Sequence, residues 1–297
     1  MNETDLDIII PVYDEHADVV ARTVSEIRTA LQGREGVHVI VVDDGSREEC
    51  GLSGLASDPG LTLVQHAVNR GYGMALKTGI LTGSAPWVAI IDADGTYPPG
   101  DLPRLLAELP GHDMVVGIRV GEVREIPWLR RMPKWVLNQL ASYMAGVPIR
   151  DLNSGMRIFS RSLALRFWGL LPAGFSFTST LTMGSTMGGY RVAEVPIDYF
   201  KRVGSSSIHP TRDTVRFLRI ILRLGGLFAP RRVFTPIAVL LLFAGLSKGF
   251  FRDYLGTGSV GNVAVVLMIA GLQVWLMGFL ADLVVASRML GPGRPNE

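Results

Sequence analysis

Asp92 and Asp94 are the residues of this sequence with the clearest capacity for chemistry. They follow the apolar run 87–91 (WVAII), whose composition is typical of a buried β-strand. Side chains two residues apart on an extended chain point the same way, so both carboxylates should converge where the strand ends. Two such charges repel each other unless a cation lies between them, and carboxylates are preferred ligands of hard divalent ions. The spacing alone is consistent with a metal site that carries substrate phosphates and with a simple turn of Asp and Gly.

Acidic residues also follow two other apolar runs of the N-terminal half. Asp14 and Glu15 come after run 7–11, and Asp43 and Asp44 come after run 37–42. In an α/β sheet, ligands bind at the edge formed by the carboxyl ends of the parallel strands. The repeated pattern therefore predicts one acidic edge rather than three unrelated turns.

Strand-like and helix-like segments alternate in this half of the chain. The expected strands are 7–11, 37–42, 61–64, 87–91 and 113–117, and the expected helices are 17–31, 73–84 and 101–109. Such alternation predicts an α/β domain with a mainly parallel sheet and helices on both faces. No glycine-rich segment has the spacing of a phosphate-binding loop or of the dinucleotide fingerprint, which argues against a Rossmann dehydrogenase.

The composition excludes several classes of protein. Lys and Arg number 29 against 27 Asp and Glu, so the charge balance gives no sign of nucleic-acid binding. Cys50 is the single cysteine and the five histidines show no metal-ligand spacing, which argues against a disulfide framework and a zinc site. The hydrophobic share is 48%, and the excess is concentrated near the C-terminus.

Two long apolar segments account for this excess. Residues 233–247 carry no charge and the apolar run continues past Lys248, and residues 260–281 are again uncharged. A membrane-spanning helix needs about 20 largely apolar residues, so we expect transmembrane helices at 233–252 and 260–286. The alternative is a pair of buried helices in a soluble core. Small residues on these helices, Gly245, Gly261 and Gly271, could also pack against a second copy in a homo-oligomer.

The basic residues around the two segments predict their orientation. Six arginines lie between residues 212 and 232, two follow the second segment, and the loop between the segments has only Arg252. The positive-inside rule then places the N-terminal domain, residues 1–212, and both termini in the cytoplasm. Residues 126–147 and the juxtamembrane segment 213–229 mix apolar and basic side chains, as amphipathic helices in a membrane interface do. A surface helix packed on the domain's own core is an equal alternative for either one.

Six segments of the chain resemble the family 2 glycosyltransferases, which have the GT-A fold. The closer resemblance is to polyprenyl-phosphate glycosyltransferases such as dolichyl-phosphate mannose synthase and the bacterial undecaprenyl-phosphate glucosyltransferases. The segments occur in the family's order within residues 6–212. They are 10–15 (IPVYDE), 41–46 (VVDDGS), 69–79 (NRGYGMALKTG), 92–99 (DADGTYPP), 151–157 (DLNSGMR) and 202–207 (RVGSSS).

The resemblance implies which residues bind the nucleotide. Pro11, Tyr13 and Glu15 match the motif that lines the nucleotide pocket, and Asp43 matches the acid that holds the base or the ribose. An Asp there can accept a hydrogen bond from a ribose hydroxyl or from a base N–H. Lys77 matches a basic position that contacts the nucleotide or lies on a solvated helix face.

The resemblance also implies a metal site. Asp92 and Asp94 match the family's metal motif, with Asp94 as the more direct ligand of Mg²⁺ or Mn²⁺, and Ala93 between them belongs to the nucleotide-sugar site. Relatives often carry Gln where this chain has Thr96. A Thr hydroxyl is a shorter and weaker oxygen ligand, so water is the alternative ligand at that point.

On the acceptor side, Arg119 and Arg202 match family arginines associated with the acceptor phosphate. The loop after Arg202 lacks a lysine that many relatives have, and Ser205 and Ser206 would supply hydroxyl donors there instead. Arg131 or its neighbour on segment 126–147 is a further candidate for the same phosphate.

Asp151 completes the expected catalytic set of Asp92, Asp94, Asp151, Arg119 and Arg202. It matches a motif position near the sugar or the acceptor, where it would act as a base or bind sugar hydroxyls. Helix capping or turn formation in the Asp-Leu-Asn-Ser-Gly segment is the structural alternative.

The implied reaction is a metal-dependent, inverting transfer of a sugar from a UDP- or GDP-sugar to dolichyl or undecaprenyl phosphate at the cytoplasmic membrane face. One alternative is transfer to the hydroxyl of another membrane lipid, such as diacylglycerol, which would require a base. The other is a non-catalytic membrane subunit that binds a nucleotide-sugar, although the intact acidic motifs argue against it.

Overall fold

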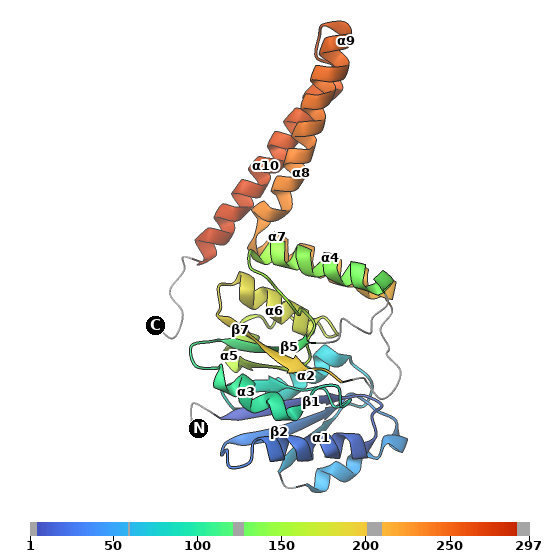
Figure 1. Ribbon diagram of the computed structural model, residues 1–297, viewed down its shortest axis with the longest axis vertical. Coiled ribbons are helices and arrows are strands. Elements are labelled where there is room, and N and C mark those ends of the chain that lie inside the picture. The colour runs from blue at the N-terminus through green and yellow to red at the C-terminus, as the bar shows by residue number, and fades with distance from the viewer. Residues whose placement is uncertain (1–4, 59, 121–127, 201–209, 290–297) are drawn as a thin grey trace. The chain divides into compact units, whose positions relative to one another are not determined.

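The structure, a computed structural model, describes residues 5–58, 60–120, 128–200 and 210–289 (Figure 1). The chain divides into two compact units. The first contains Met1–Asn138 and Ile149–Phe217, and the second contains Gln139–Pro148 and Leu218–Glu297.

A seven-stranded sheet forms the centre of the first unit (Figure 1). Its strands, in the order β3-β2-β1-β4-β6-β5-β7, run parallel except for β6, which is antiparallel to both of its neighbours. This arrangement confirms the predicted α/β fold with a mainly parallel sheet. The strands are β1 (Leu6–Val12), β2 (Val37–Asp43), β3 (Leu61–Gln65), β4 (Trp87–Ile90), β5 (Met114–Val120), β6 (Arg157–Ser160) and β7 (Val192–Asp198).

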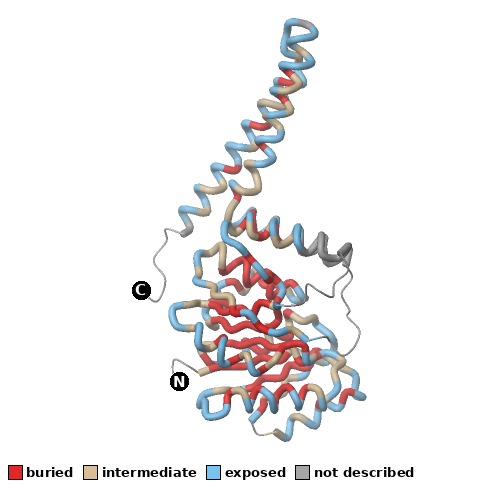
Figure 2. The backbone as a smooth tube through the Cα atoms, viewed as in Figure 1, coloured by how far each residue is buried: buried red, intermediate tan, exposed pale blue. Residues whose placement is uncertain are grey.

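Helices cover both faces of this sheet because its central strands are apolar on both sides. Ile8 and Ile10 of β1 belong to one core with α1 (Ala17–Ala30) and α3 (Leu102–Ala107). The intervening Ile9 faces α2 (Tyr72–Thr82), where Gly79 allows the helix to approach its side chain closely. The central strands β1 and β4, and most of β2, are accordingly buried (Figure 2). The unit also contains α5 (Arg161–Arg166), α6 (Phe177–Met187) and the 3₁₀ segments η1 (Glu48–Cys50), η2 (Leu52–Ser57) and η3 (Pro99–Asp101).

The register of the sheet gathers the acidic residues at one edge. Val12 pairs with Asp43, and Ile9 pairs with Ile90, so β1, β2 and β4 all end on the same side. Because β6 is antiparallel, it begins at this edge, so the loop that leads into it lies beside the carboxyl ends of β4 and β5. Residues from five separate chain segments are therefore brought to a single site.

The second unit contains two long apolar helices joined as a hairpin (Figure 1). They are α8 (Pro230–Ser247), continued by the π-helical η5 (Lys248–Tyr254), and α10 (Asn262–Met289), with α9 (Leu255–Thr257) between them. Pro230–Tyr254 and Asn262–Ser287 are long and apolar enough to cross a membrane, with mean hydropathies of 1.8 and 2.3. Only 17% of each apolar stretch is buried, which does not fit the alternative of core helices in a soluble protein.

Small residues bring the two helices of the hairpin together. A Cβ at Gly245 would lie 3.0 Å from the carbonyl oxygen of Ala264, and one at Gly271 would lie 3.0 Å from the nitrogen of Leu242. Gly261 likewise packs on the side chain of Asp253, whose carboxylate accepts two hydrogen bonds from Lys248 Nζ. These glycines therefore serve contacts within one chain, and packing against a second copy stays a prediction.

Two amphipathic helices cover the segments expected to lie in the membrane interface. They are α4 (Trp128–Ala145) and α7 (Pro210–Phe228). Trp135, Val136 and Tyr143 are exposed on α4, and Leu218 and Leu222 are exposed on α7. Exposed aromatic and aliphatic side chains on basic helices are consistent with an interfacial position, which remains a prediction.

Candidate active site

Asp92 lies directly beyond the end of β4 and has two close neighbours at its carboxylate. Its Oδ1 accepts a hydrogen bond of 2.9 Å from the hydroxyl of Tyr72. A Cβ at Gly155 would lie 2.2 Å from its Oδ2, so only glycine allows this backbone to approach the carboxylate so closely. The carboxylate is thus held from two sides by segments remote in sequence.

Asp94 is oriented within its own turn. Gly95 adopts φ +71°, a left-handed conformation that suits glycine, and turns the chain back toward Asp94. The Oδ1 of Asp94 then accepts hydrogen bonds from the backbone N–H of Thr96 at 3.2 Å and from its hydroxyl at 2.6 Å. Thr96, the position where relatives often have Gln, therefore positions a carboxylate and is itself buried.

The donor groups at this edge fit a hard divalent cation. Within the described ranges, no group of three or more His, Cys, Asp or Glu side chains could hold a metal ion. Asp92 and Asp94 would thus bind it as a pair, and the remaining ligands would come from diphosphate oxygens and water. Mg²⁺ commonly binds in this way, and an all-oxygen donor set suits Mn²⁺ equally.

The residues expected to bind the nucleotide lie at the neighbouring strand ends. Asp43, at the end of β2, is buried, and its two oxygens accept hydrogen bonds from Ser46 N at 2.9 Å and from Gln65 Nε2 at 3.1 Å. Tyr13 is exposed just beyond β1. Pro11 and Glu15 are half-buried and Ala93 is buried.

Asp44 belongs to the acidic edge expected from the sequence, but the sequence analysis gave it no role of its own. Its carboxylate lies 2.6 Å from Nδ1 of His66 and accepts hydrogen bonds from the backbone of Arg70 and Gly71 at 2.9 and 2.7 Å. His66 in turn lies 2.9 Å from the Thr78 hydroxyl on α2. This buried network fixes the loop that leads into α2. The repeated Asp at positions 43 and 44 was the only signal for it.

Arg119, near the carboxyl end of β5, and Asp151, on the loop before β6, form a bidentate ion pair. Arg119 Nε donates to Asp151 Oδ2 at 2.7 Å, and Nη2 donates to Oδ1 at 2.9 Å. Both side chains are about nine-tenths buried, with exposures of 10% and 7%, and the guanidinium lies 5.1 Å from the ring centre of Tyr199. The structure thus joins two predicted site residues that the sequence had assigned to separate roles.

Arg157 is a second arginine of this region and was not among the predicted site residues. It is fully buried at the start of β6, where it donates to the carbonyl oxygens of Ser154 and Thr178 and to the Thr182 hydroxyl. Burial lowers the pKa of Arg157, while the charges of nearby Asp151 and Asp92 raise it. The side chain joins the loop that carries Asp151 to helix α6.

Other predicted residues lie elsewhere or outside the described residues. Lys77 Nζ donates to the carbonyl oxygen of Trp168 at 3.2 Å and lies 5.0 Å from its ring centre, and burial lowers the pKa of Lys77. The partly buried lysine therefore contacts its own chain, and its contact with the nucleotide stays a prediction. Arg202, Ser205 and Ser206 lie outside the described residues, as does the side chain of Arg131.

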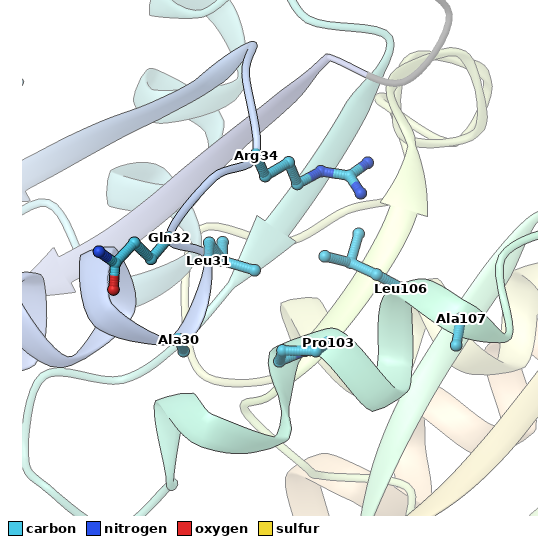
Figure 3. Close-up of a pocket in the computed structure, with 7 residues that line it drawn as sticks. All are labelled: Ala30, Leu31, Gln32, Arg34, Pro103, Leu106 and Ala107. Atoms are coloured by element: carbon cyan, nitrogen blue, oxygen red, sulfur yellow. The ribbon is translucent and has the colours of Figure 1, made fainter.

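A separate cavity of 340 Å³ lies away from these residues (Figure 3). It is lined by the C-terminal end of α1 and by α3, including Leu31, Arg34, Pro103 and Leu106. The end of α1 returns to the start of β2, so this cavity is at the opposite edge of the sheet from Asp92. It contains none of the acidic groups described above.

Comparison with known proteins identifies relatives of both parts of the chain. The family model described as Glycosyl transferase family 2 matches residues 7–168, and the one described as GtrB C-terminal hairpin matches residues 229–286. A dolichyl-phosphate hexose transferase of Haloferax volcanii is 30% identical over 208 residues, which are 69% of this chain and 87% of the relative. A polyprenol monophosphomannose synthase of Mycolicibacterium smegmatis is 31% identical over 210 residues, 66% of this chain and 77% of the relative.

A solved structure shares the fold over nearly the whole chain. It is a mannosyltransferase from Pyrobaculum calidifontis in complex with GDP-Man and Mn²⁺. The TM-score is 0.53 at 22% identity, and the match covers 96% of this chain and 87% of that chain. At this identity the likeness shows the fold alone.

Proposed function

Because this chain belongs to the glycosyl transferase family 2 and has its GT-A fold, we propose that it transfers a sugar from a nucleotide-sugar to a polyprenyl phosphate. The observation that carries the proposal is the meeting of opposite charges at one sheet edge. Asp92 and Asp94 lie at the end of β4, and Arg119 lies at the end of β5 with Asp151 beside it. An enzyme that joins a diphosphate donor to a phosphate acceptor requires both kinds of group.

Residues at the ends of β1, β2 and β4 would bind the nucleotide-sugar donor. Asp43 would accept from the ribose or the base, and Pro11, Tyr13 and Glu15 would line the same pocket. Asp92 and Asp94 would hold Mg²⁺ or Mn²⁺. When bound, the ion supplies Lewis-acid stabilisation of the nucleoside diphosphate leaving group.

The acceptor side needs charge and orientation rather than a base. A polyprenyl phosphate is already an anion near neutral pH, so its oxygen can attack the anomeric carbon without losing a proton. Arg119 would bind and aim this phosphate, with Arg202, Ser205 and Ser206 as further donors. The new C–O bond forms as the bond to the diphosphate breaks, and attack from the opposite face inverts the centre.

The ion pair between Arg119 and Asp151 supports this acceptor over a neutral lipid hydroxyl. A carboxylate held by two charge-assisted hydrogen bonds is stabilised as the anion and is a weak base. A diacylglycerol hydroxyl would need such a base, whereas a phosphate would not. Asp151 therefore acts here by holding the guanidinium of Arg119 in place.

The apolar hairpin and its flanking arginines support a membrane location in which the catalytic domain is cytoplasmic. Both spans are long enough to cross a bilayer, and Arg231 and Arg232 mark the end of the first that we place in the cytoplasm. The acceptor would then be bound from the bilayer to which the chain is anchored.

A donor and acceptor screen tests the proposal. Purified protein in lipid would be given UDP- and GDP-sugars with undecaprenyl phosphate, dolichyl phosphate or diacylglycerol, with Mn²⁺ or with a chelator. We expect sugar transfer to a polyprenyl phosphate only when the metal is present, and a loss of roughly 100-fold or more in Asp94→Asn. Transfer to diacylglycerol alone would overturn the acceptor assignment, and full activity with the chelator would overturn the metal assignment.

A further inference from the structure

Tyr72 donates a side-chain hydrogen bond to Asp92, and the family resemblance gives Tyr72 no role. It is the first residue of α2, and its hydroxyl donates to Asp92 Oδ1 at 2.9 Å. The residue is distant in sequence from the carboxylate, so the contact depends on how the start of α2 is held against the sheet.

The start of α2 is held by close backbone packing. Gly71, with φ +97°, and Gly73 lie so near the segment 172–174 that a Cβ would approach its carbonyl oxygens to 2.7 and 2.2 Å. Met74 N also donates to the carbonyl oxygen of Ala173 at 2.9 Å. Gly71 and Gly73, one on each side of Tyr72, thus allow the close backbone contact that fixes where the helix begins.

The ring of Tyr72 is held as well as its backbone. It stacks on Phe175 with centroids 5.6 Å apart and planes 19° apart. A phenol hydroxyl has one proton to donate, and here it donates that proton to the Asp92 carboxylate.

We propose that Tyr72 is a positioning residue that holds the Asp92 carboxylate in the orientation required to bind the divalent ion. The inference rests on the proposed function, in which Asp92 is a metal ligand. Groups that hydrogen-bond a metal ligand fix its direction, and their loss commonly weakens metal binding or activity by about 10- to 100-fold. The aromatic contact with Phe175 and the glycines at 71 and 73 supply the rigidity that this role requires.

Tyr72→Phe tests the role of the hydroxyl while retaining the stacked ring. Mn²⁺ affinity would be measured by titration of the full-length protein in lipid, with Mn²⁺ alone and with UDP or GDP present. We expect the dissociation constant for Mn²⁺ to rise about tenfold. Saturating Mn²⁺ should restore most of the turnover number, because the hydroxyl acts through Asp92 and does not touch the substrate.

Tyr190→Phe is the matched control. Tyr190 makes an edge contact with Phe167 and precedes β7 at the opposite edge of the sheet. We expect its Mn²⁺ affinity to equal that of the unsubstituted protein. A Tyr72→Phe protein with unchanged Mn²⁺ affinity would overturn the inference, and so would an equal loss in Tyr190→Phe.

Phe175→Leu and Asp92→Asn separate this inference from the proposed function. Phe175→Leu keeps the Tyr72 hydroxyl, so its loss of Mn²⁺ affinity should be smaller than that of Tyr72→Phe. An equal or larger loss would assign the effect to the ring and overturn the inference. If Asp92→Asn binds Mn²⁺ as tightly as the unsubstituted protein, the metal site of the proposed function fails, whatever the result for Tyr72.

Discussion

At the scale of single residues, the acidic edge depends on side chains that orient other side chains. Thr96 holds Asp94, Tyr72 holds Asp92, and Asp151 holds Arg119. Groups that are to bind a metal or a phosphate need fixed directions before the ligand arrives, because ordering them on binding would cost free energy. The site therefore depends on Thr96, Tyr72 and Asp151, which orient side chains, as well as on the residues that would contact the ligand.

Thr96 provides a direct test of this ordering. Thr96→Val removes the hydroxyl that donates to Asp94 Oδ1 at 2.6 Å while keeping the side chain's shape. We expect Mn²⁺ affinity in the presence of a nucleoside diphosphate to fall about tenfold, and Thr96→Ser to retain it. The measurement is a Mn²⁺ titration of each variant, and equal affinities for Val and Ser would contradict the assigned role.

Asp151 distinguishes a phosphate acceptor from a hydroxyl acceptor. Asp151→Asn removes the charge but keeps one acceptor oxygen toward Arg119, so we expect kcat to stay within about tenfold of its original value. Loss of a general base would instead lower kcat by about 10²- to 10⁴-fold. Steady-state kinetics with saturating donor and acceptor decide between these outcomes.

At the scale of elements, most of the sheet followed from periodicity and composition. Five strands were predicted because their apolar runs are long, and β1, β2 and β4 are buried on both faces. β6 and β7 were not predicted. β6 has four residues and begins with Arg157, and β7 includes Glu194, Pro196 and Asp198, so neither resembles a buried apolar run.

For the site, the acids at the strand ends could be predicted from the sequence, but the long-range contacts between side chains could not. Strand-end acids are visible in sequence because the strand and the carboxylate are adjacent. The bond from Tyr72 to Asp92 and the ion pair of Arg119 with Asp151 join residues 20 and 32 positions apart. Such contacts depend on the antiparallel insertion of β6 and on the placement of α2, which sequence spacing does not specify.

Arg157 shows how an element can depend on one buried charge. Arg157→Met leaves the Ser154 carbonyl and the Thr182 hydroxyl without the donor that Arg157 supplies, while the Thr178 carbonyl keeps its hydrogen bond from Thr182 Oγ1. We expect the free energy of unfolding to fall by about 3 kcal/mol or more, since each buried group left unsatisfied costs about 1–3 kcal/mol. Thermal unfolding of the purified protein should show a lower Tm by several degrees.

Arg104→Met is the control for this substitution. Arg104 is exposed and pairs with Asp101 on the surface. Exposed ion pairs contribute about 0–1 kcal/mol, so its unfolding temperature should change little. Equal destabilisation by both substitutions would show that the buried contacts of Arg157 stabilise the fold no more than the exposed ion pair of Arg104 does.

At the scale of the whole molecule, an α/β unit and an apolar hairpin are joined in one chain. The hairpin is closed at its loop by Lys248 and Asp253 and along its length by Gly245 and Gly271. Its outward side chains, such as Leu240 and Phe243, are largely exposed. This distribution is the reverse of a soluble core and suits a lipid solvent.

The single native cysteine makes the orientation of this hairpin measurable. In a Cys50→Ser background, Ser259→Cys places a thiol in the exposed loop between the spans and Glu297→Cys places one at the C-terminus. We expect a membrane-impermeant maleimide to label Ser259→Cys in intact cells and Glu297→Cys only after permeabilisation. The opposite labelling pattern would contradict a cytoplasmic catalytic domain.

The ion pair of Arg119 and Asp151 has a consequence for the order of events in a catalytic cycle. In the proposed function, an arriving phosphate would have to compete with the Asp151 carboxylate already bound to the guanidinium, so acceptor binding would exchange one anion for another. A phosphate monoester carries close to two negative charges near pH 7 and competes well. The sugar-linked product is a diester with a single charge and competes less well. The Asp151 carboxylate would then bind the Arg119 guanidinium again after each transfer, and this would help to release the product into the bilayer.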